Sequence, residues 1–168
     1  DLAIGAAEGD RWYGNPASDT YWSHDKDGVV YITYMNTDGS IKSTVEIDKD
    51  TSNGPGSGAD SSYGKSIANL GDFDGDGVVD IAVGMPGPHL SSTVKGEVNI
   101  HFMNADGSVK STVKINDDTA NGPSLTAGDK YGSDIANMGD LDGDGVIDIA
   151  VGAEEDSSIA DDDGAVYI

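Results

Sequence analysis

Apolar and polar residues alternate along several short segments of this chain, a pattern typical of β-strands that turn one face toward a core. One such segment, residues 96–103, has apolar side chains at every second position: Val98, Ile100 and Phe102. Residues 29–35 repeat this spacing, and residues 80–84 and 148–152 are mostly apolar runs that end in glycine. Helical spacing is nearly absent and glycine is abundant, so we expect an all-β protein with many turns.

The chain is repetitive, with a period of 68 residues. Residues 35–47 recur as residues 103–115, and an Asp-Gly pair inside each copy predicts a hairpin turn between two strands. One repeat therefore holds four expected strands, at residues 66–70, 80–84, 96–103 and 109–115. A four-stranded antiparallel sheet repeated at this period is typical of a β-propeller blade. A linear β-solenoid is the competing fold, although its repeats are usually shorter.

The repeats divide the chain into about two and a half expected blades, which cannot close a ring. The expected blades are residues 1–65, 66–133 and 134–168. Open sheet edges invite pairing with other chains. We therefore expect either part of a larger propeller or a subunit that completes its sheets by strand exchange with further copies of itself. The chain opens on Asp1 rather than Met, which favours a processed product or part of a longer protein.

A nine-residue acidic loop occurs twice, at residues 72–80 and 140–148, with aspartate at loop positions 1, 3, 5 and 9 and glycine at position 6. Four carboxylates in a tight loop repel one another unless a hard cation lies among them, and oxygen ligands suit Ca²⁺ or, less well, Mg²⁺. The residue at position 7 can add its backbone carbonyl. The predicted ligands of the two Ca²⁺ sites are Asp72, Asp74, Asp76, Val78, Asp80, Asp140, Asp142, Asp144, Val146 and Asp148.

The loop matches only the first half of the EF-hand pattern. An EF-hand places a bidentate Glu at loop position 12, where this chain has Val83 and Val151. The flanking segments also carry a strand signal rather than a helix signal. We therefore expect the cation to close a β-hairpin, and the alternative is a solvated acidic turn without a specific ion.

These motifs together carry a family resemblance. Tyr63 and Gly64, the loop at 72–80 and the Gly-Met-Pro run at 84–86 resemble an FG-GAP repeat, the blade unit of the integrin α-subunit propeller and of many bacterial surface proteins. The resemblance implies an integrin-like propeller braced by Ca²⁺ on the loop aspartates, in a surface protein of bacterial type. It also aligns Asp1 with the last loop position, as the final ligand of a further site.

The composition and the motifs of the chain exclude several classes of partner and of catalytic site. The chain has 31 acidic residues against 9 lysines and arginines, and a net charge of -22 argues against nucleic acid and anionic membranes as partners. No apolar run approaches the ~20 residues that span a bilayer, so no membrane insertion is expected. No nucleophile motif, phosphate-binding glycine loop or zinc spacing is present, so we assign no catalytic residue. His101 falls on the polar side of its strand, where we expect it to face solvent.

One segment, at residues 9–27, breaks the repeat because it is 11 residues longer than its counterparts, and it contains both tryptophans. Aromatic and arginine side chains dominate binding hot spots. The candidate contact residues for a protein or carbohydrate ligand are Arg11, Trp12, Tyr13, Tyr21 and Trp22. Alternatively, these rings cover an adjoining blade or subunit. Replacing Trp12 and Trp22 separates the two cases, because only the second predicts a loss of folding.

The sequence therefore predicts a non-catalytic, calcium-stabilised extracellular module for adhesion, protein interaction or assembly. Calcium sites of this weaker class have dissociation constants of roughly 10⁻⁴ to 10⁻³ M, and the extracellular calcium concentration of about 1 mM would fill them. We therefore expect a secreted or cell-surface location. One alternative is a structural subunit of a surface filament or sheath assembled by strand exchange. The other is an accessory propeller of a larger secreted enzyme.

Overall fold

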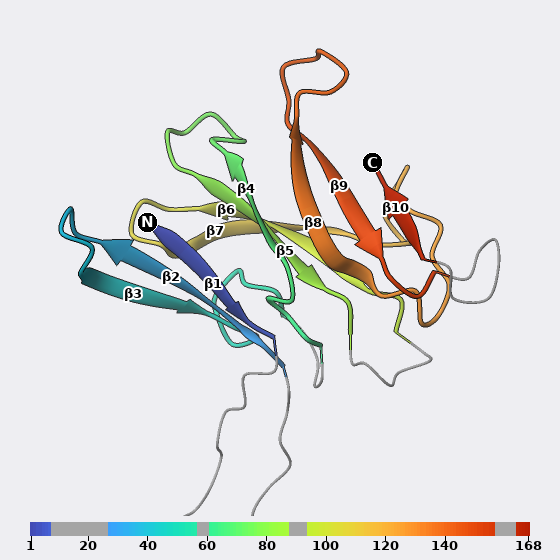
Figure 1. Ribbon diagram of the computed structural model, residues 1–168, viewed down its shortest axis with the longest axis horizontal. Helices are drawn as coiled ribbons and strands as arrows, with labels where there is room; N and C mark the ends of the chain where they lie inside the picture. The colour runs from blue at the N-terminus through green and yellow to red at the C-terminus, as the bar shows by residue number, and fades with distance from the viewer. Residues whose placement is uncertain (8–26, 57–60, 88–93, 157–163) are drawn as a thin grey trace, which may run out of the picture.

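The structure, a computed structural model, describes residues 1–7, 27–56, 61–87, 94–156 and 164–168. Every regular element in these ranges is a β-strand, and the strands form three antiparallel sheets (Figure 1). The prediction of an all-β protein is therefore confirmed. Among the described residues, no helix is long and apolar enough to cross a membrane.

Each sheet is a meander in which strands that follow one another in the sequence lie side by side. The first sheet has the order β1 (Leu2–Ala6), β2 (Val29–Met35), β3 (Ile41–Ile47). The second has the order β4 (Ile67–Gly71), β5 (Asp80–Met85), β6 (Glu97–Met103), β7 (Val109–Ile115). The third has the order β10 (Ala165–Tyr167), β9 (Asp148–Ala153), β8 (Tyr131–Gly139). The four strands expected for the middle repeat are all present, and their ends differ from the prediction by at most one residue.

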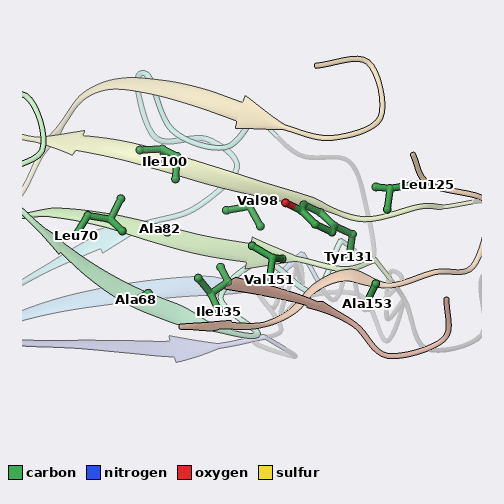
Figure 2. Packing of buried hydrophobic residues seen from close by; sticks show 10 residues of the cluster. All are labelled: Ala68, Leu70, Ala82, Val98, Ile100, Leu125, Tyr131, Ile135, Val151 and Ala153. Atoms are coloured by element: carbon green, nitrogen blue, oxygen red, sulfur yellow. The ribbon is translucent and has the colours of Figure 1, made fainter. Parts of the chain in front are cut away.

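The second sheet lies between the other two and packs against both (Figure 1). Toward the third sheet it contributes a buried cluster that includes Leu70, Val98 and Ile100, which meet Ile135 and Val151 (Figure 2). A separate cluster fills the space toward the first sheet, with these buried members: Val30, Ile47, Tyr63, Ile81, Val83, Met103 and Val109. Burial on both faces explains why β5 reads as a continuous apolar run rather than as an alternating one.

The same packing overturns the expectation for His101. Its strand alternates in sequence, but Asn99 and His101 are both 0% exposed, because the first sheet covers the face on which they lie. The prediction that His101 faces solvent is wrong. Alternation in a strand predicts that its two faces meet different surroundings, and here both surroundings are protein.

A series of hydrogen bonds satisfies the polar side chain of His101 on this buried face. The Thr112 hydroxyl donates to the carbonyl of Asn53 at 2.5 Å, so toward His101 Nδ1, 2.7 Å away, it acts as an acceptor. His101 therefore carries its proton on Nδ1, and Nε2 accepts from the Tyr63 hydroxyl at 2.8 Å. Burial lowers the pKa of His101 from its ordinary value of 6.5 to about 4, and the Lys114 charge acts in the same direction. Burial, with the charge of Asp48, raises the pKa of Tyr63, which keeps its phenol neutral.

Two glycines allow neighbouring sheets to approach at backbone distance. A methyl group at Gly84 on β5 would lie 2.0 Å from the carbonyl oxygen of Gly132 and 2.2 Å from Ser66 Oγ. At Gly5 on β1 the corresponding distance, to the carbonyl oxygen of Gly64, is also 2.0 Å. At Gly152, the counterpart of Gly84 on β9, the nearest atom of the described residues is Ser133 Oγ at 3.2 Å. Among the described residues, close backbone contacts therefore require glycine at Gly5 and Gly84 but not at Gly152.

The buried histidine predicts a pH-dependent stability. In the unfolded chain His101 protonates near pH 6.5, whereas in the fold its pKa is about 4. Its stabilising contribution is therefore fully present above about pH 6.5 and is lost as the pH falls toward 4. Compared with the variant His101→Gln, the native protein should lose about 2 kcal/mol of unfolding free energy between pH 7 and pH 5. Urea denaturation of both proteins across this range measures the difference between their unfolding free energies at each pH. The carboxylates, which both proteins share, contribute equally and drop out of this difference. A difference that stays constant with pH would contradict the assignment.

The glycine contacts predict a contrast between two equivalent positions. Gly84→Ala forces a methyl group into backbone atoms of the next sheet and should destabilise the protein by about 3 kcal/mol or more. Gly152→Ala meets no backbone atom of the described residues at such a distance and should cost less than about 1 kcal/mol. Chemical denaturation of both variants provides the comparison. Equal losses in the two variants would show that the close approach at Gly84 is not a constraint.

Candidate metal centres

The two acidic loops join β4 to β5 and β8 to β9, and they project from the same side of the molecule (Figure 1). Their tight course depends on glycines with left-handed backbone: Gly75 and Gly77 have φ of 80° and 88°, and Gly143 and Gly145 have φ of 84° and 92°. The chain therefore turns sharply enough to bring distant loop positions together, as the sequence predicts. The strands on either side of each loop also agree with the expected β-hairpin.

Three carboxylates converge in each loop. Asp72, Asp74 and Asp80 each place a ligand oxygen within 4.8 Å of the others, and so do the equivalent Asp140, Asp142 and Asp148. These are the side chains at loop positions 1, 3 and 9. Carboxylate oxygens are hard donors of the kind that Ca²⁺ and Mg²⁺ accept, so the donor set suits such a cation. Both clusters could therefore hold a metal ion.

Aspartates at loop position 5 are not part of these clusters. Asp76 Oδ1 instead accepts from the amide of Val78 at 2.9 Å, and Asp144 Oδ1 accepts from the amide of Val146 at 2.8 Å. Each side chain thereby closes a turn around the residue whose carbonyl is predicted as a ligand. The roles of Asp76, Asp144 and the two valine carbonyls at a metal ion stay predictions.

Backbone amides stabilise the loops independently of any ion. Asp72 Oδ2 accepts from Gly77 N at 2.9 Å, and Asp140 Oδ2 accepts from Gly145 N, also at 2.9 Å. These bonds span the loop from position 1 to position 6 in both copies. The two loops thus share this cross-loop hydrogen bond, in agreement with their identical pattern of aspartate and glycine.

The last aspartate of the loop also ties it to the sheet. Asp80 is 0% exposed, with Oδ2 accepting from Phe73 N at 3.0 Å and Oδ1 accepting from Met103 N at 2.9 Å. Asp1 makes the corresponding bond in the first sheet, where its Oδ1 accepts from Met35 N at 3.1 Å. The sequence alignment of Asp1 with Asp80 thus agrees with the structure, although its role as a metal ligand stays a prediction.

The first loop also has a lysine partner. Lys110, on β7, places Nζ 2.7 Å from Asp74 Oδ2 and 2.7 Å from Asp76 Oδ2. The hydrogen bonds that Lys110 donates to these two carboxylates raise its pKa, so it remains a cation. The Lys110 hydrogen bond is also the largest cause of the lowered pKa of Asp76. Within the described ranges, no lysine pairs with the second loop.

Sequence reasoning missed Lys110. Its contact with the loop follows from the antiparallel pairing of β6 with β7, which carries the start of β7 back to the end of the sheet where the loop lies. A lysine just after a hairpin turn is a weak signal by itself, because charged residues are common there. The candidate contact residues Arg11, Trp12, Tyr13, Tyr21 and Trp22 lie outside the described residues, so their role stays a prediction.

Known proteins that resemble this chain include integrin α subunits. The chain is 30% identical over 131 residues to integrin alpha-4 of Xenopus laevis, a match that covers 76% of this chain and 11% of that protein. It is 35% identical over 135 residues to integrin alpha-6 of Gallus gallus, with 80% and 11% covered. No protein-family model matches the chain.

The chain thus spans about a tenth of the length of the curated relatives it matches. These matches support an integrin-like repeat. Neither of them supports the bacterial-type origin, which stays a prediction. Over most of its length, this chain is similar to one stretch of integrin α subunits.

Proposed function

We propose that this chain is a calcium-stabilised, non-catalytic extracellular module for adhesion, protein interaction or assembly. The observation that carries the proposal is the pair of equivalent carboxylate clusters, one at the same end of each of two successive sheets. The sequence similarity to integrin alpha-4 and alpha-6 supports a surface module over an enzyme. In this proposal the three sheets are consecutive blades of a β-propeller.

The position of the clusters supports a structural role for calcium. Asp80 and Asp148 are the first residues of β5 and β9, which carry buried residues of the core such as Val83 and Val151. Asp72 and Asp140 directly follow β4 and β8, the strands that pair with them. A bound Ca²⁺ would supply the positive charge that lets these carboxylates lie together. The loop aspartates then hold the ends of two paired strands in register.

The electrostatics of the whole chain supports the same role. A net charge of -22 disfavours a compact state through self-repulsion, and the loops concentrate part of that charge. A site formed only in the folded protein stabilises the fold by mass action when its ion is present. Extracellular calcium suits sites of low affinity, which supports a location outside the cell. The proposed partner is a protein or carbohydrate ligand, with residues 9–27 as the candidate contact segment.

Strand exchange is the second candidate function, and the sheet edges favour it. Among the described residues β1 pairs only with β2, and β10 pairs only with β9, so each presents an unpaired edge. Exposed edges are templates for pairing with another chain. The described structure thus leaves room for copies to join into a filament or sheath. An accessory role in a secreted enzyme would need a catalytic domain beyond these 168 residues.

Calcium should raise the thermal stability of the protein. With dissociation constants of roughly 10⁻⁴ to 10⁻³ M, 10 mM Ca²⁺ should add about 1.4 to 2.7 kcal/mol per site. Scanning calorimetry in EDTA and in 10 mM CaCl₂ measures the increment. Asp142→Asn should remove the increment of the second loop, whereas Asp38→Asn, in the exposed turn between β2 and β3, should leave both increments intact. Identical melting curves in the two buffers would refute the structural role.

Sedimentation velocity distinguishes the two candidate functions. A module that acts alone should sediment as a 17.2 kDa monomer with and without Ca²⁺ at micromolar concentrations. Strand exchange should instead give larger species whose proportion increases with protein concentration, because the open edges pair between copies. Electron microscopy of any large species shows whether they are filaments.

A further inference from the structure

The turn that follows β3 contains an Asn-Gly pair whose two residues are both required by the local backbone. Asn53 has a left-handed conformation, with φ of 58°, which asparagine adopts more readily than most residues do. A methyl group on Gly54 would lie 2.9 Å from both Cβ and the carbonyl oxygen of Thr51, so a larger residue would displace the turn. Asn121 and Gly122 occupy the equivalent turn of the next repeat under the same constraints.

Asn53 connects this turn of the first sheet to the second sheet. Its side-chain amide donates to the carbonyl oxygens of Val109 and Lys110, at 3.4 Å and 3.2 Å. Its backbone carbonyl accepts from the Thr112 hydroxyl at 2.5 Å. We call these three hydrogen bonds the Asn53 latch. They join residues that are 56 to 59 positions apart in the chain.

A β-bulge in β7 gives the latch a structural role. The pairing of β7 with β6 passes from Ser111 to Val109 while β6 advances by one residue, so Lys110 has no counterpart on β6. The extra residue of a bulge is left unpaired by the neighbouring strand, and its backbone carbonyl needs another donor. Asn53 supplies that donor from the first sheet. The latch therefore satisfies an irregularity of β7 and ties the two sheets together.

An Asn-Gly pair is also chemically labile. The backbone nitrogen of the glycine, which no side chain shields, attacks the side-chain carbonyl carbon of the asparagine. The nitrogen loses its proton, the side-chain nitrogen leaves as ammonia, and a cyclic succinimide forms. Water then opens the ring at one or the other of its carbonyls, which gives aspartate or isoaspartate. The reaction needs water and no oxidant or reductant.

The fold opposes the first step of this reaction at Asn53. Gly54 N donates its hydrogen to the carbonyl of Thr51 at 2.9 Å, and the Asn53 amide group that must leave is bound to two carbonyl oxygens. Attack therefore requires the turn and the latch to open. When opening and closing are fast, the rate of the reaction follows the fraction of time that this segment is open.

Neither product can close the latch again. Aspartate would place a carboxylate oxygen, which has no hydrogen to donate, against the carbonyl oxygens of Val109 and Lys110. Isoaspartate would add a methylene group to the backbone of a tight turn. Both products leave the carbonyl of the bulge without its donor.

We propose that Asn53 is a deamidation site, protected while the latch is closed, and that its conversion to aspartate or isoaspartate permanently opens this connection between the first and second sheets. The inference goes beyond the proposed function and does not depend on calcium. Asn53 is exposed, so water has access to the site. Each opening of the latch is reversible until the reaction takes place, and the extent of conversion therefore records the total time that the latch has been open.

Peptide mapping by mass spectrometry measures the conversion at residue 53 after incubation of the chain in mildly alkaline buffer. In the folded protein, Asn53 should convert about tenfold or more slowly than in the urea-unfolded chain, because the latch and the turn hold the reacting groups. Equal rates in the folded and unfolded chains would overturn the proposed protection.

A pair of variants separates opening of the latch from unfolding of the whole protein. Thr112→Val removes the hydroxyl that donates to Asn53 and should accelerate the conversion several-fold. Val151→Ala is the matched control, because it weakens the core between the second and third sheets without touching the latch, and it should leave the rate unchanged. Circular dichroism verifies that each variant is folded. No acceleration in Thr112→Val, or equal acceleration in both variants, would overturn the role of the latch.

The product of the reaction can be tested directly, without Thr112→Val. Asn53→Asp is the aspartate product, and Asn53→Gly removes the side chain but retains a residue suited to a left-handed backbone. In both variants the amide of Gly54 should exchange its hydrogen about tenfold faster than in the native protein, after correction for intrinsic rates. Asn36→Asp, in the exposed turn between β2 and β3, changes the charge equally and should not alter this exchange. Exchange at the native rate in Asn53→Asp or Asn53→Gly would overturn the latch.

Discussion

Face-to-face packing of the sheets is the constraint on which the other features of this protein depend. The second sheet buries both faces, one against the first sheet and one against the third. This packing requires Gly84 where backbones approach closely, and it forces polar side chains such as His101 to find partners inside the protein. It also sets the positions of the acidic loops, because each loop joins two strands of a packed sheet.

Charge is the second determinant, and it acts mainly in the loops. Three carboxylates within 4.8 Å of one another are costly without a positive charge, yet the fold repeats this arrangement in two successive sheets. The amide hydrogen bonds of the loops compensate part of the cost, and Lys110 compensates part of it in one loop. In the proposed function, a bound cation would supply further compensation. The stability of the loops and the proposed cation binding therefore depend on the same residues.

Local patterns of the sequence predict a large part of this arrangement. Alternation and glycine punctuation place the four strands of the middle repeat to within one residue, because strand and turn preferences act over a few neighbouring positions. The loop pattern predicts that aspartates at positions 1, 3, 5 and 9 come together, and those at positions 1, 3 and 9 do so, since the turn that joins them is local. Asp76 shows the limit of this reasoning: its place in the loop is local, but its pairing with Lys110 is not.

The sequence by itself determined the all-β class, the repeat and the two acidic hairpins, all of which follow from interactions between residues close together in the chain. Only the tertiary structure decided that the polar face of β6 is buried, because covering that face depends on another sheet far away in sequence. The pairing of Lys110 with one loop was decided in the same way, by the register of β6 with β7. Pairing between strands that are distant from the loop in sequence therefore brings a cation to the first hairpin, which the local pattern of the loop does not specify.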